Sequence, residues 1–151
     1  MAHFAQLNEE NIVIRVIVVE NKHITNWWGR EKESIGIKYC QNLLGESTIW
    51  KQTSYTAVGN GFRGNYAGIG CTYMTKVATL GVGSTDIFIR QQPYPSWSIG
   101  VGTAQWYAPI DMPEVTEEEW ADKKFYIWDE AAYNADTGNP KTVGWALTSM
   151  N

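Results

Sequence analysis

Side chains that support covalent or acid–base catalysis are scarce in this sequence. It contains two histidines, His3 and His23, and two cysteines, Cys40 and Cys71. Neither histidine lies in a recognised nucleophile pattern, and the cysteines are too few and too far apart for a disulfide framework or a zinc site. We therefore expect surface or turn histidines, buried free thiols, no bound metal and no catalytic residue.

Adjacent carboxylates are present, but their positions do not favour an enzyme. They occur at Glu9-Glu10, at Glu117-Glu118-Glu119 and at Asp129-Glu130. All three groups fall in predicted turns or on solvated faces, where runs of charge usually lie. A glycosidase pair is a minor alternative to this interpretation. The sequence predicts a protein that is not an enzyme.

Positive charge is also in short supply. The chain has 12 Lys and Arg against 16 Asp and Glu, a formal net charge of −4 and a pI near 5.1. No basic stripe is available to neutralise phosphates, so nucleic acid is not expected as a partner. The same charge disfavours binding to an acidic membrane surface.

Long apolar runs are missing as well. No stretch approaches 18 consecutive apolar residues, so no membrane-spanning helix is predicted. The first residues, Met1 to Gln6, contain no basic segment followed by an apolar one, so we predict no signal peptide. We expect a soluble protein that is synthesised in a cytoplasm.

Aromatic side chains, in contrast, are abundant. Eight Trp and eight Tyr occur among 151 residues, with 44% hydrophobic and 19% charged residues overall. The overall composition is that of a globular protein, and the length fits one domain or one domain with an appendage. A packed aromatic side chain buries about 150–250 Å², so the surplus predicts that some aromatic area meets a partner.

The first half of the chain predicts a sheet covered by one helix. Residues 2 to 20 are predicted to form a β-hairpin, and the β-branched run from Ile12 to Val19 is predicted to be the central strand of the sheet. A helix is predicted from Lys32 to Leu44, with Ile37, Cys40, Leu43 and Leu44 at helical spacing and Gly45 at its C-terminal end.

Further strands are predicted at 47–54, 71–74 and 85–90, with a continuation at 76–82. A glycine-dense stretch from 59 to 70 separates the first two of these strands and predicts a structural loop, with tight turns at Gly61, Gly64, Gly68 and Gly70.

Tryptophans recur in pairs beyond residue 91. Trp97 and Trp106 flank Gly100-Val101-Gly102, and Trp128 and Trp145 flank a polar loop at 134–140. Each pair predicts a β-hairpin with one Trp on each arm. Between them, Thr116 and Glu119 form a capping-box pattern that predicts one helical turn.

Together these patterns predict an α+β, mainly β protein. An N-terminal antiparallel sheet with one covering helix occupies residues 1–90, and Trp-rich β-hairpins occupy 91–151. Because an isolated hairpin is marginally stable in water, the hairpins must pack on the body, on each other or on a partner chain.

Two motifs resemble ligand sites but lack the required context. Gly59 to Gly64 matches G-x-G-x-x-G, yet a strand rather than a helix is predicted after it, so no cofactor is expected. Asn134 to Asn139 is rich in oxygen ligands, but the twelfth position of a calcium loop would be Trp145 instead of Glu. A plain turn is the better interpretation.

The aromatic hairpins are the remaining signal, and two interpretations stay open. Their tryptophans could form the core of a thin region, or some rings could stay exposed as a platform for a sugar or another subunit. The candidate binding or assembly residues are Trp97, Trp106, Tyr107, Tyr126, Trp128 and Trp145.

A resemblance to known sequences covers most of the chain and includes the segments Trp50–Tyr55, Phe62–Gly70, Pro93–Trp97 and Tyr126–Glu130. In these segments the chain resembles a family of small, poorly characterised virion-associated proteins of tailed phages of marine cyanobacteria and other marine bacteria. Ile89 to Gln92 departs from the Ile-Pro-Pro usual in such sequences before Pro93, and residues 21–34 resemble a variable insertion.

The resemblance implies a bacteriophage structural or decoration protein of the virion, in the capsid or as a tail accessory, that acts through protein–protein contacts. Its partners would be other virion proteins, in a homo-oligomer or a larger assembly. The alternative is a carbohydrate-binding or host-receptor module of the virion, in which Trp97, Tyr107, Trp128 or Trp145 stacks on a sugar.

Overall fold

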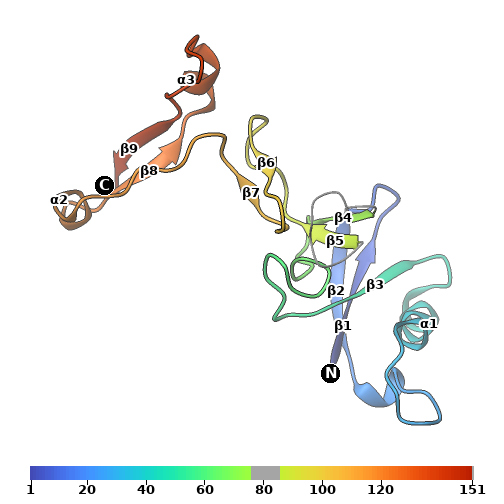
Figure 1. Ribbon diagram of the computed structural model, residues 1–151. Helices are drawn as coiled ribbons and strands as arrows, with labels where there is room; N and C mark the ends of the chain where they lie inside the picture. The colour runs from blue at the N-terminus through green and yellow to red at the C-terminus, as the bar shows by residue number, and fades with distance from the viewer. Residues whose placement is uncertain (76–85, 151) are drawn as a thin grey trace. The chain divides into compact units, whose positions relative to one another are not determined.

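The computed structural model describes residues 1–75 and 86–150 of the chain (Figure 1). It has the α+β, mainly β architecture that the sequence predicts. The predicted continuation at 76–82 lies outside the described residues. In chain order the elements are β1 (Ala2–Leu7), β2 (Val13–Val19), the 3-10 turn η1 (Asn21–His23), α1 (Glu33–Leu44), β3 (Ile49–Thr53), β4 (Thr72–Thr75), β5 (Asp86–Ile89), β6 (Ser98–Ile99), β7 (Trp106–Tyr107), α2 (Glu117–Ala121), β8 (Lys124–Trp128), α3 (Glu130–Ala135) and β9 (Trp145–Ser149).

The chain forms two compact units. The first comprises Met1–Gln91 together with Ile99–Trp106, and the second comprises Gln92–Ser98 together with Tyr107–Asn151. The predicted division into 1–90 and 91–151 stays a prediction. None of the helices in the described parts of the chain is long and apolar enough to cross a membrane.

The first unit is built on an antiparallel sheet with the order β2-β1-β3. The predicted hairpin at residues 2 to 20 is confirmed, but the prediction that its apolar second strand is central was wrong. β2 lies at the sheet edge and leaves Ile14 and Val18 exposed. β1 occupies the centre because it pairs with β2 along one edge and with β3 along the other, and both of its faces are covered.

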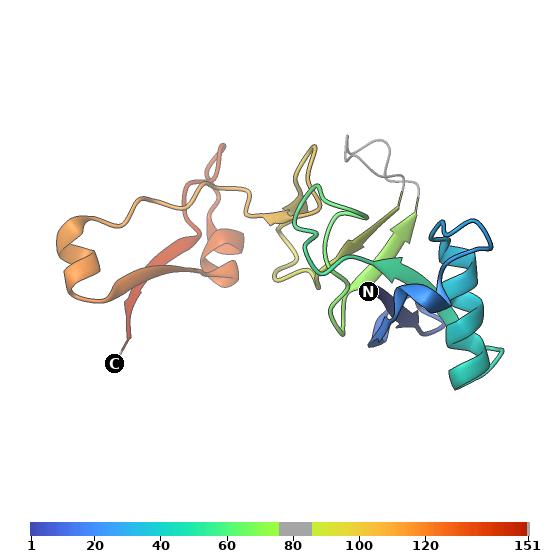
Figure 2. The same ribbon diagram turned by 90° about the horizontal axis from the view of Figure 1, so that it is seen from below.

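Alternate residues of β1 enter two different clusters. Phe4 packs on the α1 side of the sheet with Cys40 and Trp50. Ala5 and Leu7 pack on the opposite side with a cluster that contains residues of β4 and β5. The sheet is therefore a middle layer between the helix and the paired strands β4 and β5, as the two views of this unit show (Figures 1 and 2).

Helix α1 confirms the predicted helix and its glycine terminus. Gly45 caps it with φ of 118°, a backbone conformation that favours glycine. Gly36 lies so close to Phe4 that an added Cβ would stand 2.1 Å from the ring. The predicted apolar stripe is shorter than expected, because Leu43 and Leu44 are exposed.

The glycine-rich stretch forms a loop organised around one buried side chain, Asn65. Its amide nitrogen donates to the carbonyls of Phe88 and Ala104, and its oxygen accepts from the Gly59 N–H and from the Gln105 amide. These bonds connect the loop to β5 and to the segment before β7. The loop is therefore an integral part of the first unit's core.

The second unit contains the predicted hairpin, formed by β8 and β9 with Trp128 opposite Trp145. The predicted capping box is also present, since the Thr116 hydroxyl accepts from the Glu119 N–H and the Glu119 carboxylate accepts from the Thr116 N–H. The polar loop predicted at 134–140 accounts for only part of the connection between β8 and β9. This connection begins with helix α3, whose first turn is capped by Asp129.

Candidate binding surfaces

Three tryptophans of the second unit pack on one another. The ring centroids of Trp128 and Trp145 lie 5.2 Å apart at 77°, and Trp97 lies 6.1 Å and 6.0 Å from them. Tyr94 and Tyr133 extend the cluster at its margins. Near-perpendicular packing at this spacing is favourable for aromatic pairs. These rings stabilise the hairpin and bury much of their surface against one another.

The Glu130 carboxylate holds this cluster in place. It accepts hydrogen bonds from the Ser96 N–H, the Ser96 hydroxyl and the Trp128 indole N–H. The Ser96 and Trp128 bonds keep the pKa of Glu130 below its usual value. The indole of Trp145 donates to the Ile110 carbonyl, whereas the buried indole N–H of Trp97 has no partner among the described residues.

The predicted site residues separate into different environments. Trp128 is buried, and Trp97, Tyr126 and Trp145 are half-buried in the second unit. Trp106 is half-buried in the first unit, where it packs beside Ile87 and Ile89 and its indole donates to the Arg90 carbonyl. Tyr107 is exposed. The structure thus brings together Trp97, Trp128 and Trp145.

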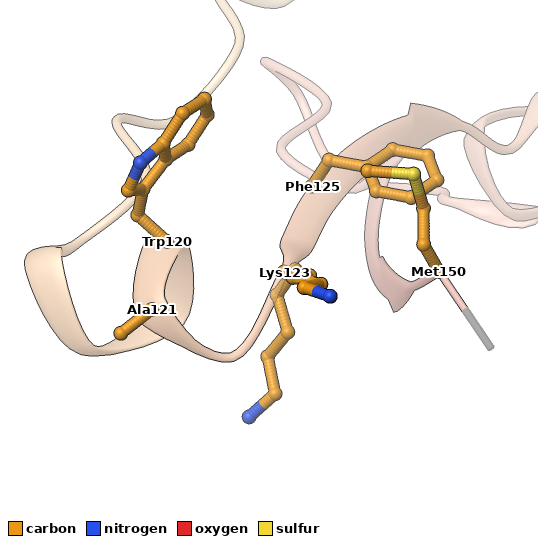
Figure 3. Close-up of a pocket in the computed structure, with 6 residues that line it drawn as sticks. Trp120, Ala121, Lys123, Phe125 and Met150 are labelled. Atoms are coloured by element: carbon orange, nitrogen blue, oxygen red, sulfur yellow. The ribbon is translucent and has the colours of Figure 1, made fainter.

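A second surface of this unit was not predicted as a site. Trp120, Phe125 and Met150 line an apolar hollow of about 370 Å³ together with Ala121, Lys123 and Lys124. Trp120 projects from α2, whereas Phe125 and Met150 project from the hairpin (Figure 3). Trp120 and Met150 are 76% and 69% exposed. The available signal was a large aromatic residue in an otherwise acidic helical turn.

Exposed apolar side chains continue beyond this hollow. Phe125 and Ile127 alternate along β8, so both lie on the opposite face from Trp128. Both are partly exposed, as is Leu147 on β9. Among the described residues of the second unit, Trp128 is the one buried large hydrophobic side chain. This unit consequently presents more apolar side chains to its surroundings than it buries.

The four glycines predicted as turn positions have different surroundings. A Cβ on Gly61 would stand 2.9 Å from the Ala57 backbone, and one on Gly64 would stand 2.7 Å from the Ala104 side chain. Gly64 and Gly70 have positive φ angles, whereas a Cβ on Gly68 would make only an ordinary contact, 3.9 Å from the Cys71 sulfur. No helix follows Gly64 in the described residues up to Thr75, so a helix N-terminus is not available for a phosphate there.

The polar loop and the cysteine Cys40 show features of structural rather than ligand-binding groups. Asp136 accepts hydrogen bonds from the N–H groups of Gly138, Thr142 and Val143, which lower its pKa and organise the polar loop. Burial raises the pKa of the Cys40 thiol to about 11, which opposes thiolate formation. Within 1–75 and 86–150, no group of three or more potential ligands from His, Cys, Asp and Glu is placed to hold a metal.

Comparisons of the chain with protein-family models, curated proteins and solved structures found no match.

Proposed function

We propose that this protein is a non-enzymatic structural component of a larger protein assembly and that it joins the assembly through its second unit. One observation carries the proposal: this unit buries a single large hydrophobic side chain in its described part and exposes Trp120 and Met150. A two-stranded hairpin has little stability by itself. A neighbouring protein that covers this apolar surface would supply the missing packing.

The resemblance to virion-associated phage proteins supports a virion as the assembly. In that setting the chain would act as a decoration or accessory subunit of a bacteriophage particle. Sugar stacking on Trp97, Trp128 or Trp145 has less support, since these rings contact one another. The Trp120 hollow is instead the more accessible aromatic surface of this unit.

Charge indicates the kind of neighbour that fits. Residues 107–151 contain nine Asp and Glu but three Lys, Lys123, Lys124 and Lys141. Two second units placed face to face would repel each other. We therefore infer that the neighbour is a different protein whose docking surface has an apolar centre.

The test is incorporation into particles of the phage whose genome encodes this chain. Quantitative mass spectrometry of purified virions should detect the wild-type protein. The double variant Trp120→Ala/Met150→Ala should reduce its amount by about tenfold or more, because central aromatic contacts dominate interface energies. Its melting temperature should stay close to the wild-type value, since both side chains are exposed.

Trp27→Ala is the matched control, because Trp27 is a similarly exposed tryptophan of the first unit. It should enter particles at the wild-type level. Absence of the wild-type protein from virions would refute the virion role. Full incorporation of the double variant would refute the role of this surface.

A further inference from the structure

A short loop before α1 presents two adjacent tryptophans on an ordered backbone. Thr25 and Glu31 form an antiparallel bridge, the Asn26 N–H donates to the Arg30 carbonyl, and the Lys32 N–H donates to the Ile24 carbonyl. Ile24 is buried and anchors the base of the loop in the core of the first unit. The loop is thus a small hairpin fixed at its base.

The tip of this hairpin is fixed by one side chain. The Asn26 carboxamide oxygen accepts from the Trp28 N–H at 3.1 Å and from the Arg30 N–H at 2.9 Å. Gly29 supplies the positive φ of 72° that the turn requires. None of these bonds involves an indole ring, so the backbone is organised independently of the rings it displays.

The two tryptophans contribute almost nothing to the core. Trp27 is 94% exposed and Trp28 is 81% exposed. Exposing two large aromatic side chains on an ordered loop forfeits their burial. Such exposure is expected where rings contact a ligand or a partner.

Alternate residues of the hairpin line a hollow beside one of the rings. Asn26, Trp28, Arg30 and Lys32 surround an open space of about 630 Å³, a size typical of sites for small molecules. Arg30 and Lys32 are exposed and form no ion pair among the described residues. The hollow therefore combines an aromatic face with two available cations, in a chain whose net charge is −4.

We propose that this hollow binds an anionic saccharide, with the sugar ring on Trp28 and its carboxylate or sulfate on Arg30 and Lys32. The C–H face of a pyranose is apolar and packs on a flat indole. The guanidinium of Arg30 can donate two parallel hydrogen bonds to one acidic group. This site lies in the first unit and is independent of the assembly role proposed for the second.

The charge of the molecule favours this ligand over two larger anionic partners. A membrane surface or a nucleic acid strand presents many negative charges at once, and the net charge of −4 opposes its approach. A saccharide with one acidic group per sugar matches the two cations of the hollow.

The experiment uses the full-length chain, with oligogalacturonate and a sulfated galactan oligosaccharide as probes and maltopentaose as the neutral control. Titration calorimetry and tryptophan fluorescence should show binding of at least one acidic probe. This binding should be weaker at high salt, and the neutral sugar should not bind. Absence of binding by both acidic probes refutes the proposal.

Matched variants separate the roles of the side chains. Trp28→Ala and the double variant Arg30→Gln/Lys32→Gln should each weaken binding by about tenfold or more. Trp27→Ala and Lys22→Gln should leave it nearly unchanged, because Trp27 does not line the hollow and Lys22 pairs with Glu20. All of these positions are exposed, so circular dichroism and thermal unfolding should confirm an unchanged fold.

Two outcomes would assign the loop to another partner and overturn the proposal. The first is equal loss of binding in Trp27→Ala and Trp28→Ala, together with sedimentation on phosphatidylserine vesicles, which would indicate membrane anchoring. The second is tighter binding of a single-stranded oligonucleotide than of either acidic saccharide. That result would indicate recognition of bases and phosphates.

Discussion

At the scale of single residues, tryptophan has three distinct environments in this molecule. Trp50 is 2% exposed in the core of the first unit, and Trp128 is buried in the second. Trp120 and Trp28 are mainly exposed and line hollows. Abundance in the sequence indicated a surplus of aromatic area, but the role of each ring depends on which neighbours the fold supplies.

The glycine-rich loop gives a prediction at the same scale. Gly64→Ala should destabilise the protein by about 2–4 kcal/mol. Its φ is +76° and its new Cβ would stand 2.7 Å from that of Ala104. Gly68→Ala is the control, since the nearest atom to its new Cβ, the Cys71 sulfur, would lie 3.9 Å away. Urea denaturation measures the free energy of unfolding of both variants. Equal destabilisation by Gly64→Ala and Gly68→Ala would contradict the assigned role of Gly64.

At the scale of secondary-structure elements, one ionic network connects α1 to the loops and strands around it. The Arg63 guanidinium bonds to Glu33 in the first turn of α1, to the Gln52 carbonyl of β3 and to Asp86 of β5. Tyr73 of β4 also donates to Asp86. Partly buried groups with several hydrogen bonds fix the geometry of the elements that carry them.

This network predicts a pH-dependent contribution from Glu33. Burial opposes its ionisation, but the hydrogen bonds from Arg63 and the Gln52 N–H outweigh burial, so its pKa lies below the ordinary value of 4.5. The carboxylate therefore stabilises the fold above pH 4.5, and this contribution is lost as the pH falls through the lowered pKa.

Glu33→Gln should thus cost about 1–2 kcal/mol at pH 7, discounted for partial exposure, and progressively less at acidic pH. Urea unfolding of the wild type and variant at pH 7 and near pH 3 measures the difference. Glu46→Gln is the control, because its pair with Lys38 is 3.7 Å long and exposed. A Glu33→Gln deficit that is constant with pH would contradict an ionic role.

At the scale of the whole molecule, the two units differ in how much core they possess. The three hydrophobic clusters of buried residues found in the described parts of the chain all belong to the first unit. The hairpin of the second unit depends on the contacts around Trp128, with Phe125 and Ile127 on its other face partly exposed. Because the second unit buries few apolar side chains, we expect it to open locally at a lower free energy than the first unit.

Hydrogen exchange should reveal this difference. In the isolated protein, amides of β8 and β9 should exchange much faster than those of β1. The variant Trp128→Ala should accelerate amide exchange in the second unit and leave that of the first unit unchanged. Trp50→Ala, in contrast, should destabilise the first unit by about 3–5 kcal/mol, since a buried Trp leaves a cavity. Equal protection of β1 and β8 would contradict the proposed dependence of the second unit on a partner.

Local patterns were sufficient where neighbouring residues determine the structure. The capping box at Thr116, the glycine terminus at Gly45 and a hairpin with Trp128 and Trp145 on its two arms were all predicted correctly from the sequence. Each depends on hydrogen bonds or pairing within one motif. Helix α3 was missed, because it is only six residues long and runs into the predicted polar loop.

The candidate surfaces were less predictable. The Trp120 hollow joins residues 120–125, at the end of α2 and the start of β8, to Met150, which follows β9 and is distant in sequence. The Trp28 hollow is local, but its segment resembled a variable polar insertion and its tryptophans were not identified as a site. Whether a ring is buried depends on tertiary contacts that no spacing rule specifies.

The sequence by itself determined the mainly β architecture, the principal helix and the surplus of aromatic area, since periodicity and turn chemistry act between near neighbours. Only the tertiary structure decided that β1 rather than β2 is central, because the third strand, β3, lies far along the chain and pairs with the edge of β1. It likewise decided that Trp97, Trp128 and Trp145 pack on one another while Trp28 and Trp120 remain exposed, since burial depends on contacts between distant segments.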